Sequence, residues 1–286
     1  MQTENLAKGI MPSILDNQMD LIHHIVRMLH VRTDVQKVFP EDGVNHQTSA
    51  SVLLLLGPGG DKPGKPAEPC LILNKRSHKV RQPGDLCFPG GSIFPRLDRP
   101  LAKLFSLPIT SLGRWRFWPQ WRRFHPRSAR LLALLWATGL RESLEEMRLN
   151  PFAVKFLGLL PPQNLVMFRR QIFPLVTWVD RQRRFYPNWE VEKILHVPLG
   201  HLLDPTNYRR YRLQLKHSAD ADGPDVTRDF PCFAIQRSGA TEILWGATFR
   251  IAALFLEYVF DFKPPPLETL PVIEGRLARN YRTGQR

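Results

Sequence analysis

The sequence predicts an α/β fold in which helices flank a mixed β-sheet. Apolar runs of strand length, such as 50–56 and 172–179, recur between clusters of turn-forming residues. Two longer runs, 129–148 and 248–260, repeat apolar residues at helical spacing. Since each element of this kind buries an apolar face against another, we expect the strands and helices to pack in layers.

A helix is also expected near the N-terminus, over residues 17–31. Asp16 and Asn17 form a good capping pair at its start, and its apolar stripe is Met19, Ile22, Val26 and Leu29. We expect this helix to dock on the core as an arm. A turn or short helix is expected at 198–203, and further strands at 70–74, 86–88, 154–160, 193–197, 211–216, 232–236 and 243–244.

The chain divides into a helical arm (1–47), one core domain (48–262) and a tail (263–286), because the series of motifs is continuous through the core. The tail opens with three prolines after Lys263 and ends in basic residues. Such a composition predicts an extended or mobile segment.

The composition is that of an ordinary globular protein with a basic excess. The formal net charge is +14 and the pI is about 10.2, which favours polyanionic partners such as nucleotides, nucleic acid or acidic lipid. The three cysteines predict reduced core thiols rather than a disulfide framework. Neither a secretory signal nor a membrane span is expected, and we predict a cytoplasmic protein; a homodimer is left open.

Three carboxylates occupy one face of the helix expected at 129–148. Residues three and four apart share a helix face, so Glu142, Glu145 and Glu146 project together. A buried stripe of Ala137, Leu140, Leu144 and Met147 accompanies them. Crowded carboxylates suit Mg²⁺, a hard cation that binds oxygen, while an ordinary solvated helix face is the common alternative.

A basic segment and a pair of glycines lie upstream. The strand at 70–74 leads into four cations, Lys75, Arg76, Lys79 and Arg81, and a second strand ends at Phe88-Pro89-Gly90-Gly91. Glycine permits close backbone approaches that other residues prevent. Cations and bare backbone together suit a polyphosphate, and a basic hairpin with a Gly turn is the alternative.

Taken together, these segments resemble the Nudix hydrolases, and more narrowly their coenzyme A pyrophosphatase branch. The resemblance covers about 48–262 and implies a Nudix-type α/β/α sandwich with a mixed β-sheet. It is carried by Lys75-Arg76-Ser77, Arg81, Gly84, Phe88-Pro89-Gly90-Gly91, Arg141-Glu142, Glu145-Glu146, Glu190-Val191, Val197-Pro198-Leu199, Leu202-Leu203-Asp204-Pro205, Tyr208, Trp245-Gly246-Ala247-Thr248 and Arg250-Ile251.

The resemblance also implies roles for individual residues. Glu142 and Glu146 become the leading ligands of Mg²⁺ or Mn²⁺, and Glu145 becomes a third ligand or a base. Glu190 is a candidate base, although a surface role is more common for such a residue, and Arg141 belongs to the same catalytic group. The implied substrate is coenzyme A or an acyl derivative, cleaved at its diphosphate and bound by Lys75, Arg76, Ser77, Arg81, Gly90 and Gly91.

The chain departs from the usual Nudix box in several places. Forty-nine residues separate Gly91 from Arg141, thirty-six more than the motif has, and the intervening acidic residue is missing or carried imperfectly by Asp98. Arg148 stands where the family has a helix-ending Gly suited to a left-handed cap, and Ser143 where an apolar residue is usual. These departures keep a second reading open, a catalytically impaired Nudix-fold protein that binds RNA, a nucleotide or a protein partner.

The excess residues form a basic and aromatic insertion at about 95–130, inside the Nudix box. It contains nine Lys and Arg residues against the single acid Asp98, interleaved with Phe105, Trp115, Phe117, Trp118, Trp121 and Phe124. The rings could pack on the host domain. They could instead form a lid over a nucleotide, stack on nucleic acid or lie in a lipid interface.

Overall fold

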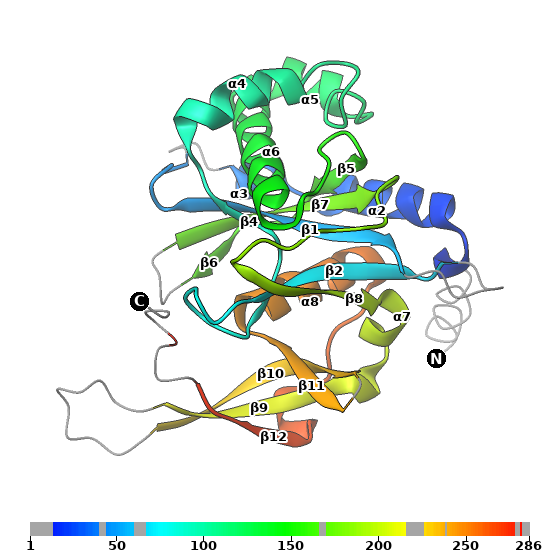
Figure 1. The fold of residues 1–286 in the computed structure, drawn as a ribbon. Coiled ribbons are helices and arrows are strands. Elements are labelled where there is room, and N and C mark those ends of the chain that lie inside the picture. The colour runs from blue at the N-terminus through cyan, green and yellow to red at the C-terminus, as the bar shows by residue number, and fades with distance from the viewer. Residues whose placement is uncertain are drawn as a thin grey trace.

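Two β-sheets form the centre of the chain (Figure 1), of which the computed structural model describes residues 14–39, 44–59, 67–165, 170–215, 226–237, 239–277 and 281. The larger sheet contains β1 (Ser49–Pro58), β2 (Pro69–Arg76), β3 (Leu86–Cys87), β4 (Gly90–Ser92), β5 (Val154–Leu159), β6 (Gln163–Leu165), β7 (Arg170–Val179) and β8 (Val191–Pro198). The smaller sheet contains β9 (Tyr208–Leu215), β10 (Val226–Arg237), β11 (Ala240–Trp245) and β12 (Val272–Gly275).

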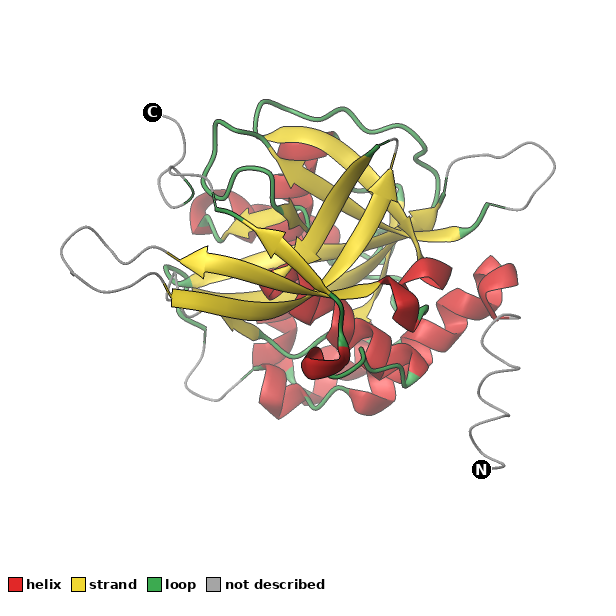
Figure 2. Cartoon of the chain, turned by 90° about the horizontal axis from the view of Figure 1, so that it is seen from below, coloured by secondary structure: helices red, strands yellow, loops and turns green. Residues whose placement is uncertain are grey.

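The larger sheet is mixed. Its main path runs β3-β2-β1-β7-β5, with β4 paired to β1, β6 to β7 and β8 to β2. β1 and β7 are parallel, whereas β2 and β4 pair with β1 in the antiparallel sense. β1 is apolar over most of its length because it is central and covered on both faces. The smaller sheet, ordered β11-β10-β9-β12, faces the viewer in Figure 2.

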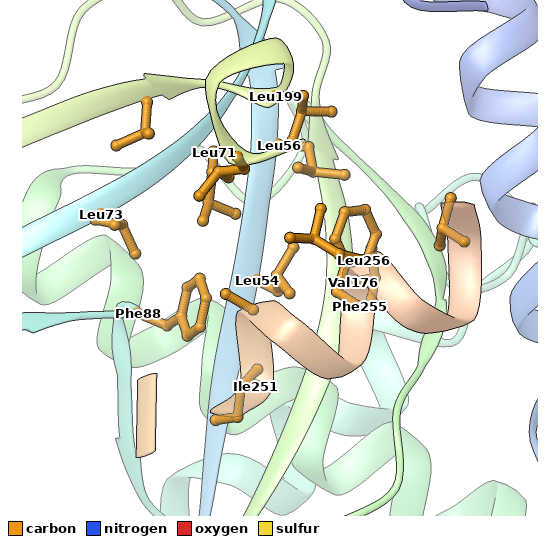
Figure 3. Close-up of a cluster of buried hydrophobic side chains, with 14 of the residues drawn as sticks. Leu54, Leu56, Leu71, Leu73, Phe88, Val176, Leu199, Ile251, Phe255 and Leu256 are labelled. Carbon is orange, nitrogen blue, oxygen red and sulfur yellow. The ribbon is translucent and has the colours of Figure 1, made fainter. Parts of the chain in front are cut away.

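Helices cover both faces of the larger sheet, as the alternation along β1 requires. Leu54 and Leu56 point into a cluster with Phe255 and Leu256 (Figure 3), whereas Leu53 and Leu55 point into a second cluster on the opposite face. The helices are α2 (Gln18–Arg32), α3 (Val35–Val38), α4 (Pro95–Phe105), α5 (Trp118–Phe124), α6 (Pro126–Met147), α7 (Leu199–Leu202) and α8 (Gly246–Phe260), with 3₁₀ turns at Pro205–Asn207 and Leu267–Thr269.

The predicted α/β/α sandwich with a mixed sheet is therefore confirmed. α8 and α2 pack on one face of the sheet, and α6 packs on the other. The helices expected at 17–31, 129–148 and 248–260 are present as α2, α6 and α8. All three cysteines are free thiols, and burial raises the pKa of Cys87 and Cys232 to about 12, so these two stay protonated.

Three local predictions were wrong. The stripe of α2 was partly wrong, because Met19 is half exposed, while Ile22 and Leu29 are buried and Val26 packs on the core as predicted; Leu21 and Ile25 complete the buried face. Gly90 and Gly91 belong to the short strand β4 rather than to a turn. The tail is not simply extended or mobile, since β12 pairs with β9 and the buried Tyr281 donates a hydrogen bond to Asp85 at 2.5 Å.

The insertion packs its three tryptophans on the host domain, whereas Phe124 is 62% exposed. Trp115, Trp118 and Trp121 are only 5–6% exposed and belong to the cluster that contains α6 and β5. Trp115 lies edge-on to Phe156 of β5 at 5.0 Å between ring centroids. Of the alternatives for this segment, the structure supports packing for the tryptophans.

α6 ends at a residue in the left-handed conformation that is not glycine. Arg148 has φ 58° and ψ 36°, which is the left-handed conformation. Its backbone N–H donates to Leu144 O, and the N–H of Leu149 reaches Ser143 O at 3.3 Å. These two bonds close the helix as a glycine cap would. A residue with a Cβ in this conformation costs about 1–2 kcal/mol.

Replacing Arg148 by Gly should therefore stabilise the fold. We expect the free energy of unfolding to rise by about 1 kcal/mol, or Tm by about 2–4 °C, because the left-handed strain is relieved. Arg148→Ala is the matched control, since it removes the same exposed side chain but keeps the Cβ. Thermal unfolding of the three proteins measures the effect, and equal gains for Gly and Ala would contradict it.

Candidate active site

The C-terminal half of α6 lies directly against β4. A Cβ on Gly91 would come within 2.5 Å of the carboxyl carbon of Glu142, and one on Gly90 would lie 2.2 Å from the carbonyl oxygen of Ser51 in β1. Gly90 also has φ 144°, a conformation that favours glycine. The two glycines thus let a strand, its neighbour and an acidic helix meet at distances that any side chain would prevent.

Glu146 is the most constrained of the three carboxylates. It accepts hydrogen bonds from the backbone N–H of Gly90 at 3.3 Å and from the side-chain amide of Asn74 at 3.0 Å. Burial raises the pKa of Glu146 to about 8, and repulsion from Glu142 and Glu190 adds to the rise, while Gly90 and Arg76 oppose it. The surroundings therefore favour the protonated form of Glu146.

Glu142 and Glu145 differ in depth. Glu142 is about one-fifth exposed and accepts a hydrogen bond from Arg141 at 3.0 Å, whereas Glu145 is 55% exposed and contacts Arg141 at 3.4 Å. Burial raises the pKa of Glu142, although Arg141 acts against the rise. Glu142 and Glu146 form the inner pair of the site, and Glu145 lies at its edge.

Asp98 bridges the insertion back to the acidic helix. It is fully buried on α4, and its carboxylate accepts from Arg141 at 2.7 Å, from Thr138 at 2.8 Å and from the backbone N–H of Phe94 at 2.7 Å. The motif spacing predicts that the acidic residue is missing or carried imperfectly by Asp98. In the structure Asp98 anchors Arg141, which then reaches Glu142 and the carbonyl of Ser92.

The basic segment separates into two faces because side chains alternate along β2. Arg76 lies on the side of Glu146 and lowers its pKa, and its guanidinium donates to the carbonyl of Arg81 at 2.7 Å. Lys75 instead pairs with Glu242 and Glu192, each at 3.2 Å, so the structure does not bring it to the inner carboxylates.

Two other predicted substrate contacts have structural roles in the loop between β2 and β3. The hydroxyl of Ser77 donates to the carbonyl of Trp189 at 2.8 Å, which fastens this loop to the segment before β8. The carbonyl of Arg81 holds Arg76, and the Arg81 side chain has no ion pair with a carboxylate in the described part of the chain.

Glu190 is brought close to Glu146 by the segment that precedes β8. This segment caps α6, since the N–H of Asn188 donates to Glu146 O at 2.8 Å and that of Tyr186 to Met147 O at 3.0 Å. The Glu190 carboxylate adds to the repulsion that raises the Glu146 pKa. The predicted base thus lies in the same electrostatic environment as the helix carboxylates.

Sequence reasoning missed two parts of this region. Asn74, the polar end of an apolar strand, holds Glu146, and that single polar residue was the available signal. Asp85, beside Arg76, accepts hydrogen bonds from Trp245 at 3.1 Å and from Tyr281 of the tail. No sequence pattern connects residues 85 and 281, so this contact could be found only from the fold.

The donor set fits a hard divalent cation. Glu142 and Glu146 offer carboxylate oxygens whose pKa values are raised, mainly by burial, and the buried side-chain oxygen of Asn74 has no hydrogen-bond partner among the described residues. Among the residues that the structure describes, no group of three or more His, Cys, Asp or Glu side chains is close enough to hold a metal ion by itself. Water and substrate oxygens would complete such a coordination shell, as Mg²⁺ commonly requires.

Removing Asp98 should destabilise the protein strongly, because Arg141 would stay buried with only part of its partners. We expect Asp98→Ala to lower the free energy of unfolding by about 3–5 kcal/mol. The neighbouring exposed Arg99→Ala should change it by less than about 0.5 kcal/mol. Denaturant unfolding compares the two variants, and a similar small effect for both would show that the bridge is dispensable.

The raised pKa of Glu146 predicts a specific pH dependence. Between about 4.5 and about 8 the folded chain keeps a proton that the unfolded chain releases, so stability falls as pH rises through this window. Glu146→Gln removes that loss. With a chelator present, the Tm difference between variant and parent should be constant below pH 4.5 and grow in favour of the variant up to pH 8. A difference that does not change with pH would refute the shift.

Comparisons with known proteins find relatives in sequence among the Nudix hydrolases. No family model matches the chain. In sequence it is 27% identical over 202 residues to the mouse peroxisomal coenzyme A diphosphatase NUDT7, a match covering 68% of this chain and 65% of that protein. It is 29% identical over 142 residues to the uncharacterized Nudix hydrolase NudL of Pectobacterium atrosepticum, covering 49% of this chain and 55% of that one.

The chain therefore aligns with less than two thirds of the length of either curated relative. Among solved structures, a Nudix hydrolase from Alicyclobacillus acidocaldarius aligns with a TM-score of 0.35 at 17% identity, covering 55% of this chain and 81% of that one. Among the described residues, no helix has the length and apolar character needed to cross a bilayer.

Proposed function

We propose that this chain, a member of the Nudix hydrolase superfamily, hydrolyses the diphosphate linkage of coenzyme A or of a related acyl-CoA-like nucleoside diphosphate derivative. The observation that carries the proposal is the inner carboxylate pair, Glu142 and Glu146, held against the bare backbone of Gly90 and Gly91. The support for coenzyme A as the substrate class is the sequence match to a protein named as a coenzyme A diphosphatase.

The chain's own residues supply positioning and charge. Asp98 fixes Arg141, which is a positioning residue because it orients Glu142 and the strand carrying Ser92. Arg76 offers positive charge beside the carboxylates, where the phosphates of a diphosphate would lie. Glu190 is the candidate base, because it is near enough to Glu146 to influence its pKa.

Glu142 and Glu146, with Glu145 as the outer candidate, would hold a divalent metal, Mg²⁺ or Mn²⁺. Such an ion, when bound, neutralises charge on the diphosphate and lowers the pKa of a coordinated water. Gly90 and Gly91 leave room for the diphosphate to approach the helix, since neither carries a side chain.

The alternative of an impaired Nudix-fold binding protein draws less support. That reading relied on the rings of the insertion to hold RNA or another partner, but Trp115, Trp118 and Trp121 are buried in the domain. The acidic position that seemed defective is occupied by Asp98, which contacts Arg141. Both observations weaken the case for a protein that only binds.

Turnover of a substrate panel tests this proposal. Coenzyme A, acyl derivatives, NADH, ADP-ribose and capped nucleotides are each incubated with Mg²⁺ or Mn²⁺. We expect metal-dependent cleavage, fastest for coenzyme A or an acyl derivative. Glu146→Gln should lower kcat/KM by about 100-fold or more, because it removes a charge at the centre of the site.

Two matched carboxylate variants calibrate the loss. Glu145→Gln, on the same helix but 55% exposed, should lose less activity than Glu146→Gln, and Glu257→Gln on α8 should lose none. Unchanged turnover by Glu146→Gln would remove the assignment of the metal site. Cleavage of no compound, with binding retained, would favour the binding-protein alternative.

A further inference from the structure

Several large apolar side chains of the insertion and of the loop after α6 are exposed near one another. Ile109 is 71% exposed and Phe152 64%, and both line a cavity of about 320 Å³ together with Arg114, Arg116 and Arg181. Leu104 and Leu107 are also exposed. The carbonyl of Leu107 accepts a hydrogen bond from the hydroxyl of Thr110, which lines the cavity, and the N–H of Leu107 donates to Leu104 O. We call Leu104, Leu107, Ile109 and Phe152, with Lys103, Arg114, Arg116 and Arg181, the apolar-basic surface.

Hydrogen bonds within the loop between α4 and α5 fix the conformation that exposes Leu107 and Ile109. The hydroxyl of Thr110 lies within 2.6 Å of Phe105 O and 2.7 Å of Leu107 O, and Arg114 donates to the carbonyl of Ile109. A Cβ on Gly113 would come within 1.9 Å of Leu107 O, so the loop closes as tightly as a glycine allows. Leu107 and Ile109 are therefore presented outward by a well-packed loop.

Positive charge surrounds these apolar residues and is largely uncompensated. None of the nine Lys and Arg residues of 95–130 pairs with a carboxylate in the described part of the chain, since the insertion's one acid, Asp98, is buried against Arg141. Outside the insertion, Asp180 forms an ion pair with Lys155 at 2.9 Å and a weak one with Arg181 at 3.9 Å. Figure 1 shows α4 and α5 together at the end of the molecule opposite the smaller sheet.

The chemistry of this surface distinguishes between anionic partners. Single-stranded nucleic acid needs several exposed rings on which successive bases can stack, but the three tryptophans of the insertion are buried and Phe124, 62% exposed, lies outside the apolar-basic surface. The exposed apolar groups are mainly aliphatic, which suits the acyl region just below lipid headgroups. Lys and Arg beside them suit the negative headgroups of an acidic membrane surface.

We propose that the chain binds peripherally to anionic phospholipid bilayers through the apolar-basic surface. Ile109, Leu107, Leu104 and Phe152 enter the interface, and the flanking cations contact the headgroups. The proposal does not depend on the hydrolase function, because it involves none of the residues of the acidic helix.

Sedimentation with vesicles tests it, using the full chain without metal or substrate. Vesicles of phosphatidylcholine alone are compared with vesicles of equal parts phosphatidylcholine and phosphatidylserine. We expect the protein to sediment with the vesicles that contain phosphatidylserine, and the bound fraction to fall as salt is added. Ile109→Ser should weaken partitioning about tenfold or more, since an aliphatic side chain no longer leaves water. Lys103→Gln and Arg116→Gln should each weaken it about fivefold.

The matched control is Val31→Ser on α2, because Val31 is a β-branched side chain 73% exposed outside this surface. Partitioning of Val31→Ser should equal that of the parent, and diphosphate hydrolysis by Ile109→Ser should be unchanged. The proposal is overturned by no retention on phosphatidylserine vesicles, by equal retention on both kinds, or by equal losses for Ile109→Ser and Val31→Ser. Salt-sensitive retention of single-stranded RNA without vesicle binding would also overturn it.

Discussion

The buried ion pair between Asp98 and Arg141 is the contact on which the candidate site depends. A charged pair removed from water is stable only with close geometry and further hydrogen bonds, and Thr138, Phe94 and Ser92 supply them. The pair joins a long insertion to the acidic helix. The insertion therefore lengthens the path between Gly91 and Arg141 without separating the parts of the site.

The site also concentrates charge at a cost to the fold. Glu142 and Glu146 stand in surroundings that favour their protonated forms, and the glycines of β4 allow the helix to approach so closely. An arrangement that is unfavourable for the empty protein becomes favourable once a cation neutralises it. The proposed cation would account for two glycines of β4 facing a helix with three carboxylates.

The sequence predicts those elements whose residues repeat at a regular local spacing. The long apolar repeat of α6 located the helix to within a few residues, and the Glu spacing located the acidic face. The twin glycines were read as a turn because glycine is common in turns, whereas their role is to admit Ser51 and Glu142. Other contacts join residues far apart in the chain: Asp98 binds Arg141 across 43 positions, Asn74 binds Glu146 across 72, and Tyr281 binds Asp85 across 196. Local patterns in the sequence cannot predict such pairs.

The central claim is that Glu142 and Glu146, beside Gly90, form a divalent metal site. Anomalous diffraction from crystals soaked in Mn²⁺ tests it most directly, because it locates the ion without relying on activity. The account predicts an anomalous peak between these two carboxylates, lost in crystals of Glu146→Gln. A peak elsewhere, or one that survives this substitution, would contradict it.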